Sequence, residues 1–161
     1  RLVVEGLKEA GIKLVVCLPE SLLRPLYQML REDPYFRFVP VTNEGGGASI
    51  AAGAWLGGMR AVLLMETSGL RVATEALARV GLTYGIPVFM IMSHRGDIGE
   101  VNWWGIAHGL TMEPLLQAMR IPYTIVRDEQ QIKPAIKRGI EHITTSLYHT
   151  AVVLSGDTRE A

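Results

Sequence analysis

Short apolar runs alternate with amphipathic segments along this chain. The apolar runs predict six strands, at about 13–18, 36–41, 61–65, 88–92, 123–126 and 150–154. Apolar residues at helical spacing predict helices between them, at about 2–10, 22–32, 44–55, 70–84, 112–119 and 128–148. Ser21 is the expected cap of the second helix. Strands and helices that alternate at this spacing predict an α/β fold, a three-layer doubly wound parallel sheet with right-handed crossovers.

Polar side chains follow four of the predicted strands, at the point where each strand ends. The four segments are Pro19-Glu20-Ser21, Asn43-Glu44-Gly45, Thr67-Ser68-Gly69 and His94-Arg95-Gly96. Parallel strands present their carboxyl ends at one edge of the sheet, and ligands bind at that edge in open α/β folds. The sequence therefore predicts a single site assembled from four separated segments.

Glu44 is the candidate catalytic residue of this site. It lies between the second predicted strand and a helix that opens with three glycines, Gly45 to Gly47. A structural interpretation is available, because Asn43 is a good N-cap and an acid is favoured in the first turn of a helix. Each glycine destabilises a helix by about 1 kcal/mol relative to alanine, so capping alone does not explain three glycines in a row. Their presence favours the close approach of a ligand or of another backbone.

Composition narrows the classes of function. Sixteen basic and sixteen acidic side chains among 161 residues cancel, so we expect neither a nucleic-acid partner nor a membrane surface. The single cysteine, Cys17, suits the reducing cytoplasm, and no apolar run approaches the length of a membrane span. The four histidines show no metal-ligand spacing, so no metal site is predicted on this chain. The chain is 48% hydrophobic and only 20% charged, a composition that favours a subunit interface over a monomer.

Other chemistries fit the sequence less well. The run from Gly45 departs from the dinucleotide fingerprint at Ile50, although Glu66 stands where a ribose-binding acid belongs. Ser68 lacks the surroundings of a nucleophile and is expected to be a turn or capping residue. Trp103 and Trp104 are expected to pack at an interface or in the core, with closure over a ligand as the alternative. His142 and His149 are expected on the surface.

Several linked motifs resemble a known family. Asn43-Glu44-Gly45-Gly46-Gly47-Ala48, followed by Ala51-Ala52-Gly53-Ala54-Trp55, resembles the pyrimidine-binding (PYR) domain of thiamine diphosphate-dependent enzymes. The closer similarity is to sulfopyruvate decarboxylase alpha subunits and phosphonopyruvate decarboxylases. It covers nearly the whole chain and includes the segments at 18–23, 65–70, 85–87 and 93–97.

The resemblance implies roles for individual residues. Glu44 would contact the pyrimidine N1′ of thiamine diphosphate and favour the tautomer that makes the cofactor reactive toward a 2-oxo acid. The resemblance further implies cofactor contacts and substrate contacts from the segments that follow the strands. The cofactor-binding residues would be Pro19, Glu44, Thr67, Ser68, Gly69 and Leu70, and the substrate-binding residues Ser21, His94, Arg95 and His108. A loop salt bridge or cap is an equally good interpretation of His94 and Arg95.

The resemblance also implies a partner. Thiamine diphosphate enzymes carry a diphosphate-binding domain with a Gly-Asp-Gly motif that holds Mg²⁺, and the nearest match here is Gly156-Asp157 followed by Thr158. We therefore expect residues 1–161 to form a single PYR domain, with the diphosphate-binding domain absent from this chain. A separate diphosphate-binding (PP-domain) subunit would supply the Mg²⁺ site, in an α₂β₂ or larger oligomer.

Two departures leave the substrate open. The related decarboxylases tend to have Gln-Asn-Ser-Gly where this chain has Glu66-Thr67-Ser68-Gly69. The loop at 98–108 carries Asn102-Trp103-Trp104, which is less polar than the sequence expected for a strongly anionic substrate, so an aromatic or bulkier 2-oxo acid is an open alternative. A decarboxylase subunit is the leading hypothesis. The alternatives are a thiamine-dependent carboligase subunit and a noncatalytic α/β scaffold module in which Glu44 only caps a helix.

Overall fold

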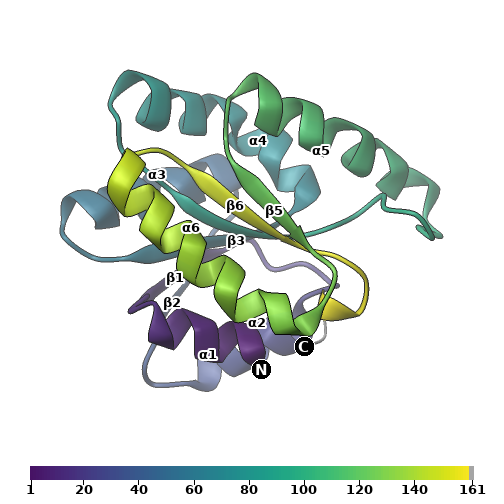
Figure 1. Cartoon of the computed structure of the whole chain (residues 1–161), viewed down its shortest axis with the longest axis horizontal. Coiled ribbons are helices and arrows are strands. Elements are labelled where there is room, and N and C mark those ends of the chain that lie inside the picture. Colours follow the sequence, from purple (N-terminus) through teal and green to yellow (C-terminus); the bar gives the residue numbers. More distant parts are fainter. Residues whose placement is uncertain (160–161) are drawn as a thin grey trace.

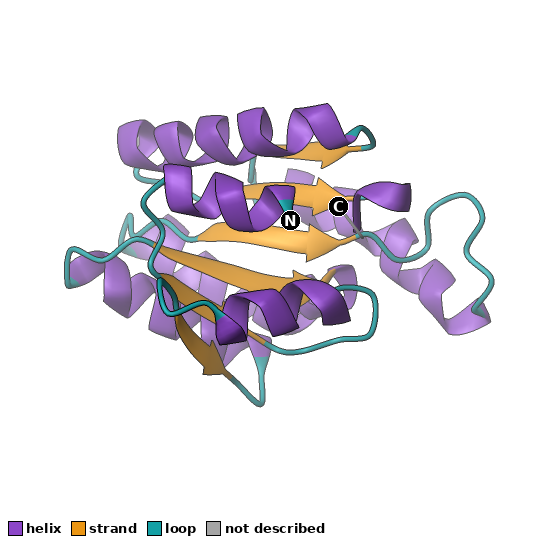
Figure 2. Ribbon diagram, turned by 90° about the horizontal axis from the view of Figure 1, so that it is seen from below, coloured by secondary structure: helices purple, strands orange, loops and turns teal. Residues whose placement is uncertain are grey.

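All six strands of the protein run parallel in one sheet, in the order β2-β1-β3-β4-β6-β5. The computed structural model describes residues 1–159. Figure 2 shows the arrowheads of the strands at one edge of the sheet and a long loop that projects beyond that edge. The strands are β1 (Leu14–Cys17), β2 (Arg37–Pro40), β3 (Ala61–Glu66), β4 (Phe89–Ser93), β5 (Tyr123–Val126) and β6 (Thr150–Leu154).

Helices cover both faces of the sheet, which makes three layers (Figure 1). One layer contains α1 (Leu2–Glu9), α2 (Arg24–Glu32) and α6 (Ile132–Ser146), and the other contains α3 (Glu44–Leu56), α4 (Thr67–Leu77) and α5 (Ile106–Ala118). Shorter helical turns lie at Ala78–Thr83, Trp103–Gly105, Glu129–Gln131 and Gly156–Arg159. The predicted α/β fold with a doubly wound parallel sheet is confirmed.

The central strands are buried on both faces, as their continuous apolar sequences predict. Every residue of β1, β4 and β6 is buried, whereas the edge strands β2 and β5 are partly exposed. Close packing of α3 on the sheet depends on Gly47, because an added Cβ would lie 2.8 Å from Leu63 Cδ1. The glycine-rich start of α3 therefore has one structural cause, namely the approach of the helix to β3.

Three local predictions were wrong. The helix predicted at 112–119 begins at Ile106 as α5, so His108 lies on a helix and not in an irregular stretch. Ser21 does not cap α2, because the helix begins at Arg24 and the carboxylate of Glu20 accepts hydrogen bonds from the amides of Leu22 and Leu23. His149 is not on the surface.

The ring of His149 is fully buried between β6 and the end of α4. The Val88 amide donates to Nδ1 at 2.9 Å, so Nε2 carries the proton and donates to the carbonyl of Leu77 at 2.8 Å. Burial lowers the pKa of His149. The side chain therefore satisfies two buried backbone groups, a role that its position beside an exposed turn in the sequence does not reveal.

No helix within residues 1–159 has the length and apolar character needed to cross a bilayer.

Candidate functional site

Glu44 is the first residue of α3, which begins shortly after the edge strand β2 ends. Asn43 is the N-cap, as predicted: its side-chain oxygen accepts hydrogen bonds from the amides of Gly45 at 2.9 Å and Gly46 at 3.2 Å. The Glu44 residue is only 7% exposed. Within the part of the chain that the structure describes, its carboxylate makes no hydrogen bond or ion pair. The Glu44 carboxylate is therefore available to accept a hydrogen bond from a group outside the chain.

Gly69 provides the surface on which the Glu44 side chain lies. A Cβ added at Gly69 would come within 2.7 Å of both Cγ and Oε1 of Glu44. Any other residue at position 69 would therefore displace the carboxylate, because real Cβ atoms do not approach other atoms this closely. The segment that follows β3 thus contributes to the site through a missing side chain, next to the acid that follows β2.

Thr67 and Leu70 support the site through contacts inside the protein. Both side chains are fully buried. The Thr67 hydroxyl accepts a hydrogen bond from the backbone amide of Arg95 at 3.1 Å, which ties the segment after β3 to the segment after β4. Leu70 packs in the core between the sheet and the layer that contains α4. Among the predicted cofactor residues of this segment, Ser68 has a partly buried side chain, and its hydroxyl donates to Glu66 Oε1 at 2.8 Å.

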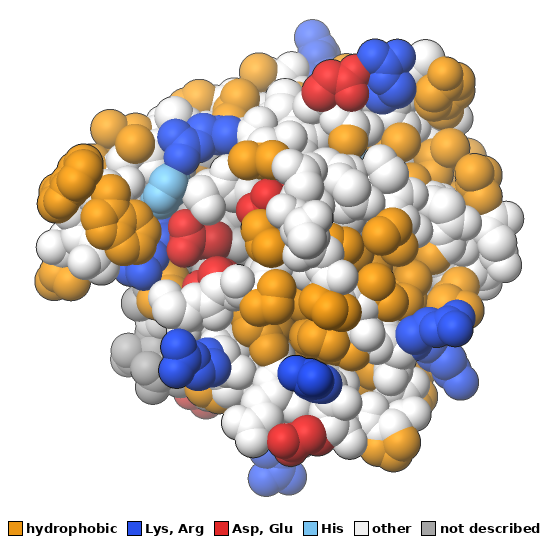
Figure 3. All heavy atoms as spheres, turned by 180° about the vertical axis from the view of Figure 1, so that it is seen from behind, with side chains coloured by type: hydrophobic (Ala, Val, Ile, Leu, Met, Phe, Trp, Pro, Cys, Tyr) orange, Lys and Arg blue, Asp and Glu red, His pale blue; other side chains and the backbone are white. Residues whose placement is uncertain are grey.

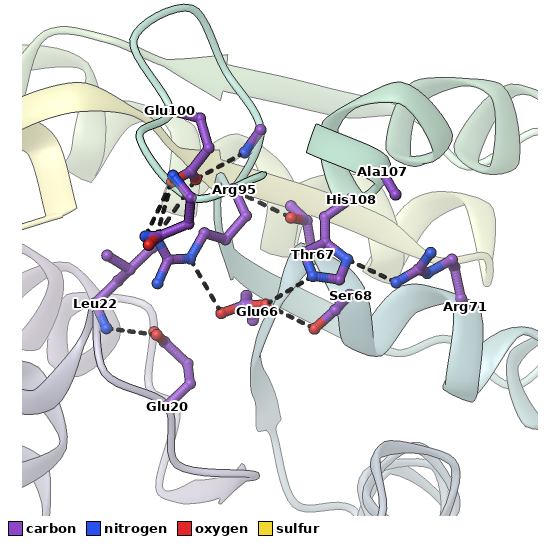
Figure 4. A network of polar contacts seen from close by, with 12 residues as sticks. Glu20, Leu22, Glu66, Thr67, Ser68, Arg71, Arg95, Glu100, Ala107 and His108 are labelled. Atoms are coloured by element: carbon purple, nitrogen blue, oxygen red, sulfur yellow. Dashed lines mark hydrogen bonds and ion pairs between the residues drawn. The ribbon is translucent and has the colours of Figure 1, made fainter. Parts of the chain in front are cut away.

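A network of charged side chains surrounds Glu66 at the carboxyl end of β3 (Figure 4). Arg95 Nε lies 3.5 Å from Glu66 Oε2, and His108 Nε2 lies 3.8 Å from Glu66 Oε1. Arg71 of α4 contacts His108 Nδ1 at 2.6 Å. Segments after β3 and β4 and the helix α5 therefore meet at one carboxylate.

Arg95 is held by the loop that follows β4. Its Nη1 lies 3.2 Å from Glu100 Oε1, and its guanidinium stacks over the ring of Trp104 at 4.6 Å. Burial alone would raise the pKa of Glu100, but the amides of Asn102 and Gly96 and the charge of Arg95 hold it at about 2. The salt-bridge interpretation of Arg95 is therefore confirmed, because two carboxylates share its charge. A role in substrate binding stays a prediction.

A cavity of about 320 Å³ lies beneath this loop, beyond the ends of β4 and β5. His94 and Arg95 line it, together with Asp97, Glu100 and Arg127. His94 is buried, and its Nδ1 lies 3.5 Å from Asp97 Oδ2. Asp97 also pairs with Arg127 and Ser155, and the Arg127 hydrogen bond is the main cause of the lowered pKa of Asp97.

The predicted site residues thus fall into two groups. In the first group, Glu44 is in contact with Gly69, and the Thr67 hydroxyl links the segment of Gly69 to the backbone of Arg95. The side chains of Arg95, Ser68 and His108 in turn all lie next to the Glu66 carboxylate. Pro19 and Ser21 are exposed on the loop after β1, where Glu20 instead turns its carboxylate inward to the backbone. Burial raises the pKa of Glu20, and the charge of Glu66 adds to that effect.

Sequence reasoning missed two members of the network, Arg71 and Glu100. Arg71 lies four residues after Thr67 on α4, and a helical projection of this segment would have placed both on one face. Glu100 has no comparable signal, because it lies in a loop without periodicity. Trp103 and Trp104 are not in the core, since they are 86% and 42% exposed. Figure 3 shows apolar side chains spread over much of one face, with acidic, basic and histidine side chains between them.

The sequence of the chain matches a family of known proteins. Residues 1–115 match the family described as thiamine pyrophosphate enzyme, N-terminal TPP binding domain. The chain is 36% identical to sulfopyruvate decarboxylase subunit alpha of Methanothermobacter thermautotrophicus over 83% of this chain and 81% of the relative. It is 31% identical to the subunit of the same name from Methanococcus maripaludis, over 94% of this chain and 91% of the relative.

Phosphonopyruvate decarboxylase of Streptomyces viridochromogenes is 39% identical, over 60% of this chain but only 24% of that longer protein. The resemblance inferred from the Glu44 motif and the segments around it is therefore confirmed. The match covers β1 to β4, Glu44 and the whole network around Glu66. The chain belongs to the thiamine pyrophosphate enzyme family, as a form of its N-terminal TPP-binding domain.

Proposed function

We propose that this chain is the pyrimidine-binding alpha subunit of a two-chain thiamine diphosphate-dependent 2-oxo acid decarboxylase. The observation that carries the proposal is the buried carboxylate of Glu44, which has no partner within the described residues. The relatives that match most of this chain are named as alpha subunits of sulfopyruvate decarboxylase, which supports both the carboxy-lyase activity and the division into two chains.

The residues around Glu44 fit a pyrimidine ring. A carboxylate in this position accepts the N1′ hydrogen bond, and the low exposure of Glu44 strengthens that bond. A Cβ at Gly46 would meet nothing within 4 Å, so the backbone beside Glu44 is open to a flat ligand. Pro19 and residues 67–70 would complete the contacts with the ring. When bound, thiamine diphosphate supplies a carbon nucleophile and an electron sink for the loss of carbon dioxide.

Ser21, His94, Arg95 and His108 would bind the 2-oxo acid. His94 and Arg95 line the same cavity, and charge-assisted hydrogen bonds from such groups suit a carboxylate. Because Glu66 and Glu100 already balance Arg95, the region offers little free positive charge for a second strong anion. That balance, together with Trp104 over Arg95, favours an aromatic or bulky 2-oxo acid.

The second subunit would hold the diphosphate and Mg²⁺ through a PP domain, in an α₂β₂ or larger cytoplasmic assembly. Exposed apolar side chains support such a junction, including Ile50 on α3, Val72 on α4 and Leu110 on α5. Burial of these groups against a partner would remove apolar surface from water and would close the site around Glu44.

Calorimetry with thiamine diphosphate and Mg²⁺ tests the proposal, with the chain alone and with the chain purified together with its natural partner. We expect tight binding only in the complex, together with release of carbon dioxide from a 2-oxo acid. Binding without carbon dioxide release, but with a coupled product from an aldehyde, would identify a carboligase. If the complex binds no cofactor, the scaffold interpretation stands and the proposal is wrong.

A further inference from the structure

The ring of His108 lies between a guanidinium and a carboxylate, from two different elements. Nδ1 contacts Arg71 Nη2 at 2.6 Å, and Nε2 faces Glu66 Oε1 at 3.8 Å (Figure 4). Trp104 packs edge-on against the ring, with 6.0 Å between the centroids. The side chain of His108 is only 13% exposed, so these neighbours fix the position of the ring.

The contact with Arg71 decides which nitrogen of His108 carries the proton. A guanidinium has five donors and no acceptor, so Arg71 donates and Nδ1 must accept. Protonation of Nδ1 would direct an N–H at the N–H of a cation. The neutral ring therefore carries its hydrogen on Nε2, the nitrogen that faces the network around Glu66.

Within the described residues, the charged groups that act on His108 come from β3, α4 and the segment after β4. Burial is the largest effect and lowers the pKa of His108, while Glu66 from β3 opposes that shift. Arg71 from α4 and Arg95 after β4 lower the pKa further, and Glu100 of the loop acts in the opposite sense. The net direction is downward, so the ring stays neutral at neutral pH.

We propose that Arg71 is a positioning residue that holds His108 as the neutral tautomer with its hydrogen on Nε2. His108 then serves as a hydrogen-bond donor and not as a proton donor. At 3.8 Å the Nε2–H group is beyond hydrogen-bond distance from Glu66, so it is available to an oxygen of a bound acid. The donor role toward substrate rests on the function proposed above, whereas the choice of tautomer does not.

The direct test is the ¹⁵N NMR titration of the histidine rings in the full chain, with His108→Gln to assign the resonances. In the unaltered protein we expect a pyridine-like Nδ1 and a pyrrole-like Nε2 for His108 at neutral pH. Arg71→Met should raise the pKa of His108 by about one unit, because a cation in direct contact is removed. Arg71→Lys keeps a donor and a charge, and should retain the original tautomer.

Arg79→Met is the matched control, because Arg79 is paired with Glu75 and is not among the charges that act on His108. It should leave the titration of His108 unchanged. A hydrogen on Nδ1 in the unaltered protein, or the same pKa in Arg71→Met, would overturn the proposal. Thermal unfolding of each variant confirms that the comparison is made between folded proteins.

Activity of the assembled enzyme separates this inference from the proposed function. We expect the limb of the pH profile of kcat/KM that reports His108 to move upward in Arg71→Met and to return in Arg71→Lys. If the NMR results are as expected but His108→Gln keeps full kcat/KM, the tautomer assignment stands and the substrate role of His108 is wrong. An unchanged NMR titration overturns the Arg71 inference whatever the activity.

Discussion

Replacement of Gly69 by alanine tests how closely the position of Glu44 is set by its neighbours. The added Cβ would lie 2.7 Å from Cγ and Oε1 of Glu44. Carbon atoms in good contact are about 3.5–4.0 Å apart, so the Glu44 side chain must move by roughly 1 Å. Gly69 is buried in the first turn of α4, which leaves the side chain of Glu44 as the group free to move.

Gly69→Ala should lower the turnover rate strongly and the free energy of unfolding only slightly. A displacement of about 1 Å at a catalytic group lowers the rate by about 100-fold. Alanine gains about 1 kcal/mol of helix propensity over glycine, while overpacking costs about 1–3 kcal/mol. The free energy of unfolding should therefore fall by no more than about 2 kcal/mol, which keeps the chain folded.

The assay is the release of carbon dioxide from a 2-oxo acid by the assembled enzyme, together with urea unfolding of the free chain. Gly53→Ala is the matched control, because it is also a helical glycine and an added Cβ would meet nothing within 4 Å. In urea unfolding of the free chain, that variant should be about 0.5–1 kcal/mol more stable than the unaltered protein. Full activity of Gly69→Ala would refute the inferred dependence of Glu44 on its neighbour.

Three further predictions concern the framework of the site. Asn43→Ala removes the cap of α3 and should lower the free energy of unfolding by about 1 kcal/mol, measured by urea unfolding, whereas Asn43→Asp should retain it. His149 has a lowered pKa in the folded chain, so the unfolded chain binds more protons as the pH falls below 6.5. The free energy of unfolding should therefore decrease as the pH falls below 6.5, and it should decrease less in His149→Gln. An equal pH dependence in the two proteins would contradict this prediction. Glu100→Gln removes the ion pair with Arg95 and weakens the hydrogen bonds that Glu100 accepts from the amides of Gly96 and Asn102. These two amide hydrogens should then exchange with solvent faster, as measured by NMR. An unchanged exchange rate would show that Glu100 does not hold this loop in place.

The fold, and the grouping of candidate residues at one edge of the sheet, were predictable because both depend on local patterns. Continuous apolar runs identify strands covered on both faces, and parallel strands necessarily bring their carboxyl ends together. Glu44 and its cap Asn43 could be placed from the strand-to-helix transition alone. Thr67 and Arg95 could be assigned to one edge for the same reason, although the hydrogen bond between them could not be foreseen.

The remaining features depend on contacts between distant segments. His149 follows an exposed turn in the sequence, yet it is buried because Val88 and Leu77 need hydrogen-bond partners there. Helix α5 begins six residues earlier than its apolar pattern predicts, which brings His108 to Glu66 and Arg71. No periodicity reports such pairings, since they arise only when the layers pack.

Exchange of the C2 proton of bound thiamine diphosphate, followed by NMR in deuterated solvent, tests the role of Glu44 most directly. The account predicts that Glu44→Gln in the assembled enzyme still binds the cofactor and keeps its fold, but exchanges the proton at least about 100-fold more slowly and loses turnover. Exchange and turnover at the rates of the unaltered enzyme would contradict the central claim that the carboxylate of Glu44 activates the cofactor.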